Sequence, residues 1–240
     1  MAIATTPPRA SAPKRAPMDS LRRTAFWAGV LYLISFVSIP TLILYGPVKE
    51  AGYIAGAGPD TGVLFGGVLE LIVGLAGIGT AVVLYKVLKR QNQAAALGLV
   101  GSRVLEGALI FAGVASILTV VAMRQAGVGA DGLVTGQALV GLYDSTFLVS
   151  QSLIPAVNAL LLGTLLYKSR LVPRGLPVLG LIGAPLLLVG TIGTIFGAWE
   201  PASPPTLLLT LPIATWEFSL GVYLVVKGFR PSPITVGMAG

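Results

Sequence analysis

The sequence predicts an all-α integral membrane protein with six transmembrane helices arranged as three hairpins. Its composition is the first reason: 55% of residues are hydrophobic and 10% are charged, whereas soluble domains carry roughly 25% charged residues. The mean hydropathy of +0.87 agrees with this. The second reason is that long apolar runs, each of a length that spans a bilayer, alternate with short links rich in charge, Pro and Gly. A third is that basic residues concentrate in every second link.

The predicted elements follow each other closely along the chain. Residues Met1–Ser20 are rich in Pro, Ala and Ser and predict a disordered basic tail. The apolar run Thr24–Tyr45 is too long for the core of a signal peptide, so we expect an uncleaved first helix. The other predicted helices are Thr61–Tyr85, Ala94–Met123, Ser145–Tyr167, Leu176–Trp199 and Thr206–Val226, which gives a membrane domain over residues 21–230 and a short, loose tail over residues 231–240.

The distribution of Lys and Arg predicts how the chain is threaded. Of the 16 basic residues, Arg103 is buried in a span and only Lys49 and Arg124 lie in the links on the far side from the termini. By the positive-inside rule, both termini are cytoplasmic, and the expected location is a bacterial inner membrane. The net charge of +7 therefore predicts contact with anionic lipid headgroups at the cytoplasmic rim rather than nucleic-acid binding. Oligomeric state is left open.

Several kinds of chemistry are excluded by missing residue types. The chain has no Cys, which excludes disulfides, thiol catalysis and thiolate metal sites. It also has no His, which excludes the zinc peptidase motif and the Ser-His-Asp triad. We therefore assign no catalytic residue from the sequence, and we expect no metal site and no cofactor.

The candidate site consists of polar residues at membrane depth. Arg103 and Glu106 are three residues apart in the third span, so on a helix they share a face and can pair. Asn158 and Glu217 each lie ten residues before the Lys that ends their helix, or about 15 Å from the cytoplasmic rim. Glu70 reaches about 24 Å on the same scale. These depths predict one polar cluster of Glu70, Arg103, Glu106, Asn158 and Glu217, with Gln151 and Asp144 nearby.

The charges of this cluster leave three interpretations open. Three carboxylates against one guanidinium are not balanced, so either Glu residues are protonated or a cation binds. A transporter-like site for a proton, cation or small ligand is the first interpretation, with Glu217 carrying the role and Asn158 supporting it from the facing helix. The alternative is a structural or signalling membrane subunit whose polar residues only hold helices together. An intramembrane enzyme is the third.

Prolines inside the spans are consistent with the first interpretation. Pro40, Pro155, Pro185 and Pro212 each remove a helix donor and can bend the chain. Pro155 and Pro212 lie just before Asn158 and Glu217. Helices broken at mid-depth are a feature of transporters, although membrane helices also tolerate proline without a functional reason.

Several motifs resemble a known family. They are Leu21–Ala25 at the start of the first helix, Ser102–Gly107 in the third, Asn158–Gly163 leading to Leu166–Arg174, and the pair Trp216-Glu217 in the sixth. Over about Leu21 to Lys227 the chain resembles the uncharacterised bacterial membrane family catalogued as domain of unknown function 4386. The resemblance implies a multi-span inner-membrane protein and supplies no catalytic residues.

Overall fold

The computed structural model describes residues 19–201 and 203–238. Within these ranges the chain is helical and contains no β-strand. Six helical segments are long and apolar enough to cross a membrane, which confirms the predicted all-α fold class. The predicted disordered tail lies outside the described residues except for its last two positions.

Each predicted span corresponds to one helical segment. The first is interrupted: α1 (Ser20–Ile34) leads through the 3₁₀ turn η1 (Ser35–Ser38) into α2 (Thr41–Leu44). The loop predicted before the second span contains two short turns of helix, α3 (Gly46–Lys49) and η2 (Tyr53–Ala55). The remaining spans are α4 (Thr61–Leu88), α5 (Gln93–Gln125), α8 (Gly175–Ile195) and α9 (Pro204–Val226), all within a few residues of prediction except for the end of α8, which stops before Trp199.

The fourth span is longer than predicted. It begins at Leu133 rather than Ser145, and consists of α6 (Leu133–Leu148), a π-helical turn η4 (Val149–Leu153) and α7 (Ile154–Ser169). The short 3₁₀ turn η3 (Gly129–Gly132) precedes it. The stretch before Ser145 looked like a loop because it contains Gly and polar residues, but its small residues let the helix pack closely. Gly136, for example, is buried against Ile54.

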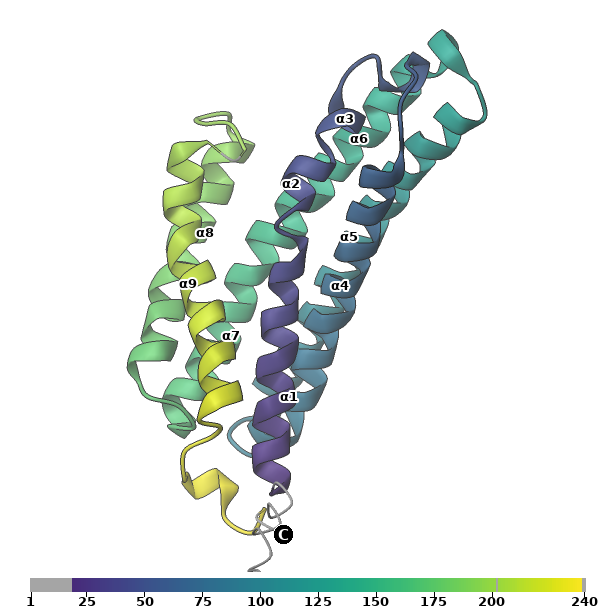
Figure 1. Ribbon diagram of the computed structural model, residues 1–240. Coiled ribbons are helices and arrows are strands. Elements are labelled where there is room, and N and C mark those ends of the chain that lie inside the picture. The colour runs from purple at the N-terminus through teal and green to yellow at the C-terminus, as the bar shows by residue number, and fades with distance from the viewer. Residues whose placement is uncertain (1–18, 202, 239–240) are drawn as a thin grey trace, which may run out of the picture.

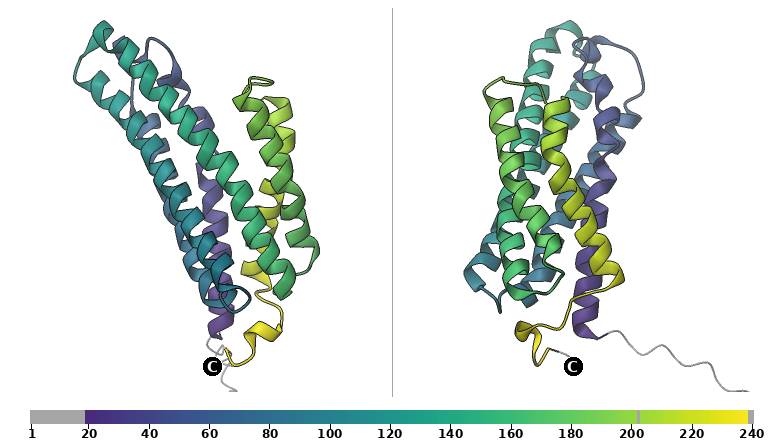
Figure 2. Two further views of the ribbon diagram at one scale, coloured as in Figure 1. Left: turned by 180° about the vertical axis from the view of Figure 1, so that it is seen from behind. Right: turned by 90° about the vertical axis from the view of Figure 1, so that its left-hand side faces the viewer.

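The helices form a bundle that is closed at one end and open at the other (Figures 1 and 2). All three predicted hairpins are present, because α1 packs on α4, α5 on the fourth span and α8 on α9. At the end that carries the described termini, one apolar core joins all the spans, with Leu84, Leu99, Leu166, Trp216 and Leu220 each at most 2% exposed. Toward the other end, α8 and α9 diverge from α2, α4, α5 and α6 (Figure 2).

The open end has its own polar contacts. Asp60, at the start of α4, accepts hydrogen bonds from Tyr53 (2.6 Å), Gln125 (2.9 Å) and Arg124 (2.9 Å). The bonds from Tyr53 and Gln125, with the charge of Arg124, hold the pKa of Asp60 below its usual range. These contacts fasten the loop before α4 to the end of α5.

The segment after α9 is ordered, in contrast to the loose tail that we predicted. Its backbone contacts the other links at the same end: Arg90 donates to the carbonyls of Ile234 and Val236, and the hydroxyl of Ser20 donates to that of Met238. Ser232 bonds the carbonyl of Ser169 at 2.5 Å. Residues 230–238 thus connect the start of α1, the α4–α5 link and the end of α7.

Close packing of α8 on α9 depends on Gly180, which yields a first prediction. A methyl group on Gly180 would lie 2.5 Å from the ring of Trp216, which is 1% exposed and has no room to move. Gly180→Ala should lower stability by about 1–3 kcal/mol, measured by thermal unfolding in detergent. Gly101→Ala in α5 is the control, since nothing lies within 4 Å of that position. Equal effects of the two substitutions would mean that this contact does not limit packing.

Candidate functional site

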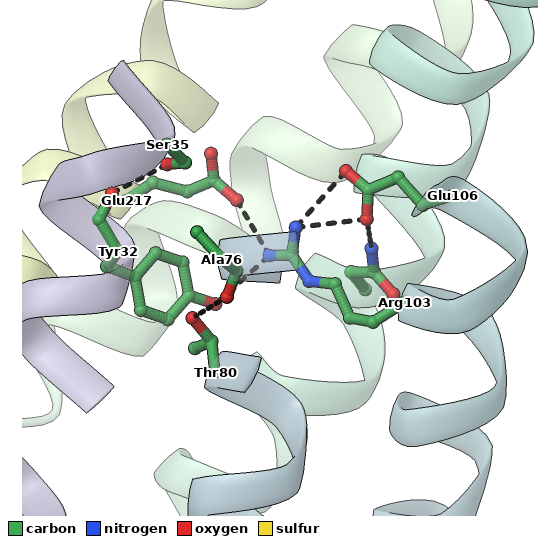
Figure 3. A network of polar contacts seen from close by, with 8 residues as sticks. Tyr32, Ser35, Ala76, Thr80, Arg103, Glu106 and Glu217 are labelled. Atoms are coloured by element: carbon green, nitrogen blue, oxygen red, sulfur yellow. Dashed lines mark hydrogen bonds and ion pairs between the residues drawn. The ribbon is translucent and has the colours of Figure 1, made fainter. Parts of the chain in front are cut away.

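Arg103 lies at the centre of a buried ionic network (Figure 3). Its Nη1 donates to both carboxylate oxygens of Glu106, at 3.2 and 3.0 Å. Its Nη2 donates to Oε1 of Glu217 at 3.1 Å and to the hydroxyl of Tyr32 at 3.2 Å. The guanidinium group therefore lies between two carboxylates from different helices, and every contact is a charge-assisted hydrogen bond or a bond to a phenol.

Local sequence explains why these groups meet. Arg103 and Glu106 are one helical turn apart on α5, in the i,i+3 relation predicted from the sequence. Glu217 approaches from α9 and Tyr32 from α1, which pack on each other. The side chains of Arg103 and Glu106 are 7% and 8% exposed, and that of Glu217 is 17% exposed. Glu217 is thus the most accessible charge of the three.

Asn158 joins the network through a different carboxylate from the predicted one. Its side-chain amide donates to Oε2 of Glu106 at 2.7 Å, so it supports Glu106 and not Glu217 as we had expected. The other atom of that amide, Oδ1, has no hydrogen-bond partner among the described residues. The network thus links α1, α5, α7 and α9.

Glu70 does not belong to this network. Its carboxylate is 3% exposed and contacts the hydroxyl groups of Tyr143 (2.8 Å), Thr41 (3.5 Å) and Tyr45 (3.5 Å). The predicted single cluster is therefore two clusters, because Glu70 lies seven residues, or about two helical turns, along α4 from Gly77, the position that packs against Arg103.

A cavity of about 260 Å³ borders the network on the side toward the open end of the bundle. We call it the cleft. The cleft is lined by the charged residues Arg103, Glu106 and Glu217 and by the side-chain amide of Gln151. Its remaining walls are mostly apolar and come from both sides of the bundle: Phe36 and Ile39 after α1, Val73 on α4, Ile110 on α5, Leu187 on α8 and Ile213 on α9.

The charges lining the cleft do not cancel. One guanidinium faces two carboxylates, which leaves one negative charge if all three groups are ionised. Only one oxygen of Glu217, Oε1, accepts the hydrogen bond from Arg103, and the second oxygen, Oε2, takes no part in it. The cleft therefore offers one carboxylate oxygen to an incoming proton or cation.

Comparison with known proteins identifies the family. A profile described as "Domain of unknown function (DUF4386)" matches residues 27–228. The chain belongs to this family. No curated protein and no solved structure matches the chain. Membership of the DUF4386 family agrees with the resemblance found in the sequence, and the match includes every residue of both polar clusters.

In this DUF4386 protein, sequence reasoning missed the tyrosines that complete both clusters. Tyr32 is 2% exposed and bonds Arg103, while Tyr45 and Tyr143 contact Glu70. A buried tyrosine hydroxyl usually finds a polar partner. Tyr32, well inside the first apolar run, was thus a usable signal, whereas Tyr45 at the end of that run and Tyr143 before the predicted fourth helix were not.

The ionic network yields a second prediction. Arg103→Ala should destabilise the protein by about 3–5 kcal/mol, because it leaves two carboxylates without a counter-charge. Glu106→Ala should cost less, since Arg103 keeps Glu217 and Tyr32. Thermal unfolding in detergent of both variants and the double variant measures this. Equal losses for the two single variants would show that Glu217 does not compensate Arg103.

Proposed function

We propose that this protein binds a small organic cation within the membrane, in the manner of a transporter. The supporting observation is the cleft, which reaches an Arg103–Glu106–Glu217 network that carries an excess carboxylate. A bound cation, or a proton, balances that charge. Ionisable groups inside membrane helices are costly, and they are found where ions or substrates pass.

The walls of the cleft favour an organic cation over a metal ion. Ca²⁺ and Mg²⁺ require about six or more oxygen ligands, and no group of three or more acidic side chains occurs in residues 19–201 and 203–238. The apolar walls instead match the alkyl groups of an amine or ammonium compound, whose charged nitrogen would approach Glu217. The volume of about 260 Å³ limits the ligand to a small molecule.

Helix breaks at the level of the cleft support a moving binding site. Ser35, Phe36 and Ser38 line it from the 3₁₀ turn between α1 and α2, and Gln151 lines it from the π-helical turn. Pro212 lies inside α9, between the lining residues Thr210 and Ile213, and cannot donate a backbone hydrogen bond there, although the helix continues through it. Such breaks let the two halves of a span move separately, as in transporters with discontinuous helices.

The structural or signalling role is the second candidate. It is favoured by the pairing of Arg103 with three side chains from three helices: Glu106 of its own helix α5, Tyr32 of α1 and Glu217 of α9. In that case the network only fixes the helices relative to each other, and the cleft is filled by lipid chains.

Cation binding separates the two candidates. Tetraethylammonium is titrated against the purified protein in lipid nanodiscs, with isothermal calorimetry as the readout. We expect saturable binding that Glu217→Gln weakens at least about tenfold, because a neutral amide removes the unbalanced charge. Glu200→Gln, on an exposed loop residue, is the matched control and should leave affinity unchanged. Absence of binding, or equal affinity for the Glu217 variant, would favour the structural role.

We further propose that the chain crosses a bacterial inner membrane six times with both termini in the cytoplasm, where its basic rim meets anionic lipids. The support is the distribution of Lys and Arg. The α4–α5 and α7–α8 links lie at the same end as the described termini (Figure 1), so one end of the bundle carries most of this charge. The cleft then opens toward the periplasm.

Single-cysteine labelling tests the threading. Because the sequence has no native cysteine, each label reports only the introduced position. An impermeant maleimide added to whole cells should label Ala57→Cys and Ala130→Cys, both in the links of the open end. It should not label Asn92→Cys until the cells are lysed. Labelling of Asn92→Cys alone in intact cells would reverse the orientation.

A further inference from the structure

Glu70 is a buried carboxyl group that the proposed cation site does not use. It lies on α4, one to two turns nearer the open end than the cleft residues Val73, Gly74 and Gly77. No basic side chain bonds it among the described residues; its three partners are the hydroxyl groups of Thr41, Tyr45 and Tyr143. A buried carboxylate without a basic partner is costly, so this group calls for an explanation.

The hydroxyl groups around Glu70 suit both the charged and the neutral carboxyl. Tyr143 donates to Oε1 at 2.8 Å, which stabilises the carboxylate. Thr41 has a single hydroxyl proton, and it donates that proton to the carbonyl of Ser38 at 2.6 Å. Its oxygen, 3.5 Å from Oε1 of Glu70, is then free to accept a hydrogen bond from a protonated carboxyl. Oε1 of Glu70 thus has a hydrogen-bond donor in Tyr143 and an acceptor in Thr41. Glu70 can therefore gain or lose a proton without a change in the position of these side chains.

Glu70 also lies between two cavities. A second cavity of about 270 Å³ at the open end is lined by Lys49, Tyr53, Gln137 and Asp144. Lys49 pairs with Asp144 at 2.6 Å and lies 5.3 Å from the centre of the Tyr143 ring, which in turn bonds Glu70. On the other side, Thr41 bonds Ser38, a residue that lines the cleft. On one side, Tyr143 thus lies between Glu70 and Lys49 of the second cavity. On the other side, Thr41 lies between Glu70 and Ser38 of the cleft.

The charged and titratable groups around Glu70 come from three parts of the chain. Tyr45 lies between α2 and α3, α6 contributes Tyr143 and the partly exposed Asp144, and α3 contributes Lys49. The neighbouring α5 side chains at this level, Val114 and Leu118, are apolar. Lys49 is paired with Asp144, so among the described residues Glu70 is left with hydroxyl groups as its only bonded partners.

We propose that Glu70 is a proton-binding site that exchanges protons between the second cavity and the cleft, so that cation binding in the cleft releases a proton from it. The carboxylate takes one proton from water on the open side and returns it to water on the cleft side, with no other bond made or broken. Thr41 and Ser38, in the interrupted stretch between α1 and α2, connect this site to the wall of the cleft. The proton site stands by itself; only its link to the cation rests on the proposed function.

Infrared difference spectra test the proton site directly. Protein in lipid is taken from about pH 5 to about pH 9, and the carboxylic acid band is followed in light and heavy water. The wild type should show a titrating band that is absent in Glu70→Gln and present in Glu217→Gln. A titrating band of undiminished amplitude in Glu70→Gln, or no titrating band at all in the wild type, would overturn the proposal.

A pair of tyrosine variants provides a test that keeps the carboxyl group. Tyr143→Phe removes the 2.8 Å hydrogen bond and should shift the frequency of the Glu70 band. Tyr45→Phe removes only a 3.5 Å contact and is the matched control, with a smaller shift expected. Equal shifts would contradict the arrangement described here.

Proton release tests the link to the cleft. In weakly buffered solution with a pH indicator, tetraethylammonium should release protons from the wild type and not from Glu70→Gln, although that variant still binds the cation. Glu217→Gln should bind weakly and keep its Glu70 infrared band, which separates failure of the cation site from failure of the proton site. Release that continues in Glu70→Gln would refute the link.

Discussion

The cost of a charge inside a low-dielectric bundle is the constraint on which the rest of this structure depends. Arg103 is compensated only because α5 supplies Glu106 and α9 supplies Glu217 at hydrogen-bonding distance. These two contacts fix how α9 lies relative to α5, with Tyr32 holding α1 in the same place. The apolar core below the network and the cleft above it meet at this level. The network therefore marks the boundary between the tightly packed half of the bundle and the half whose helices diverge.

Glu70 shows a second way to meet the same constraint. Arg103 is bonded to two carboxylates of opposite charge, whereas the bonded partners of Glu70 are neutral hydroxyl groups. A salt bridge holds helices in one arrangement, whereas a shell of hydroxyl groups serves a carboxyl in either protonation state. The same chain thus contains one polar cluster built for fixed charge and another suited to a changing one, about two helical turns apart along the bundle.

The sequence predicted the parts that follow from one-dimensional patterns. Apolar runs located all six spans, and the i,i+3 spacing predicted the Arg103–Glu106 pair. Depth along each helix correctly grouped Glu217 with Arg103 but wrongly added Glu70, because counting residues from a helix end gives no information about how the helices are shifted along each other or which way a side chain faces. The helix before Ser145 was missed because Gly and polar residues resemble a loop when their packing partners are unknown. The ordered segment after α9 was missed because its partners are backbone carbonyl groups, which no side-chain pattern reveals.

That segment also has a consequence for the order of assembly. Residues 230–238 follow the last span, yet they contact the first residue of α1, the link after α4 and the end of α7. A ribosome makes these residues only after all six helices have been synthesised. The closed end of the bundle is therefore fastened last, by a part of the chain that an incomplete product lacks. Until these residues are made, the start of α1, the α4–α5 link and the end of α7 lack the contacts that join them.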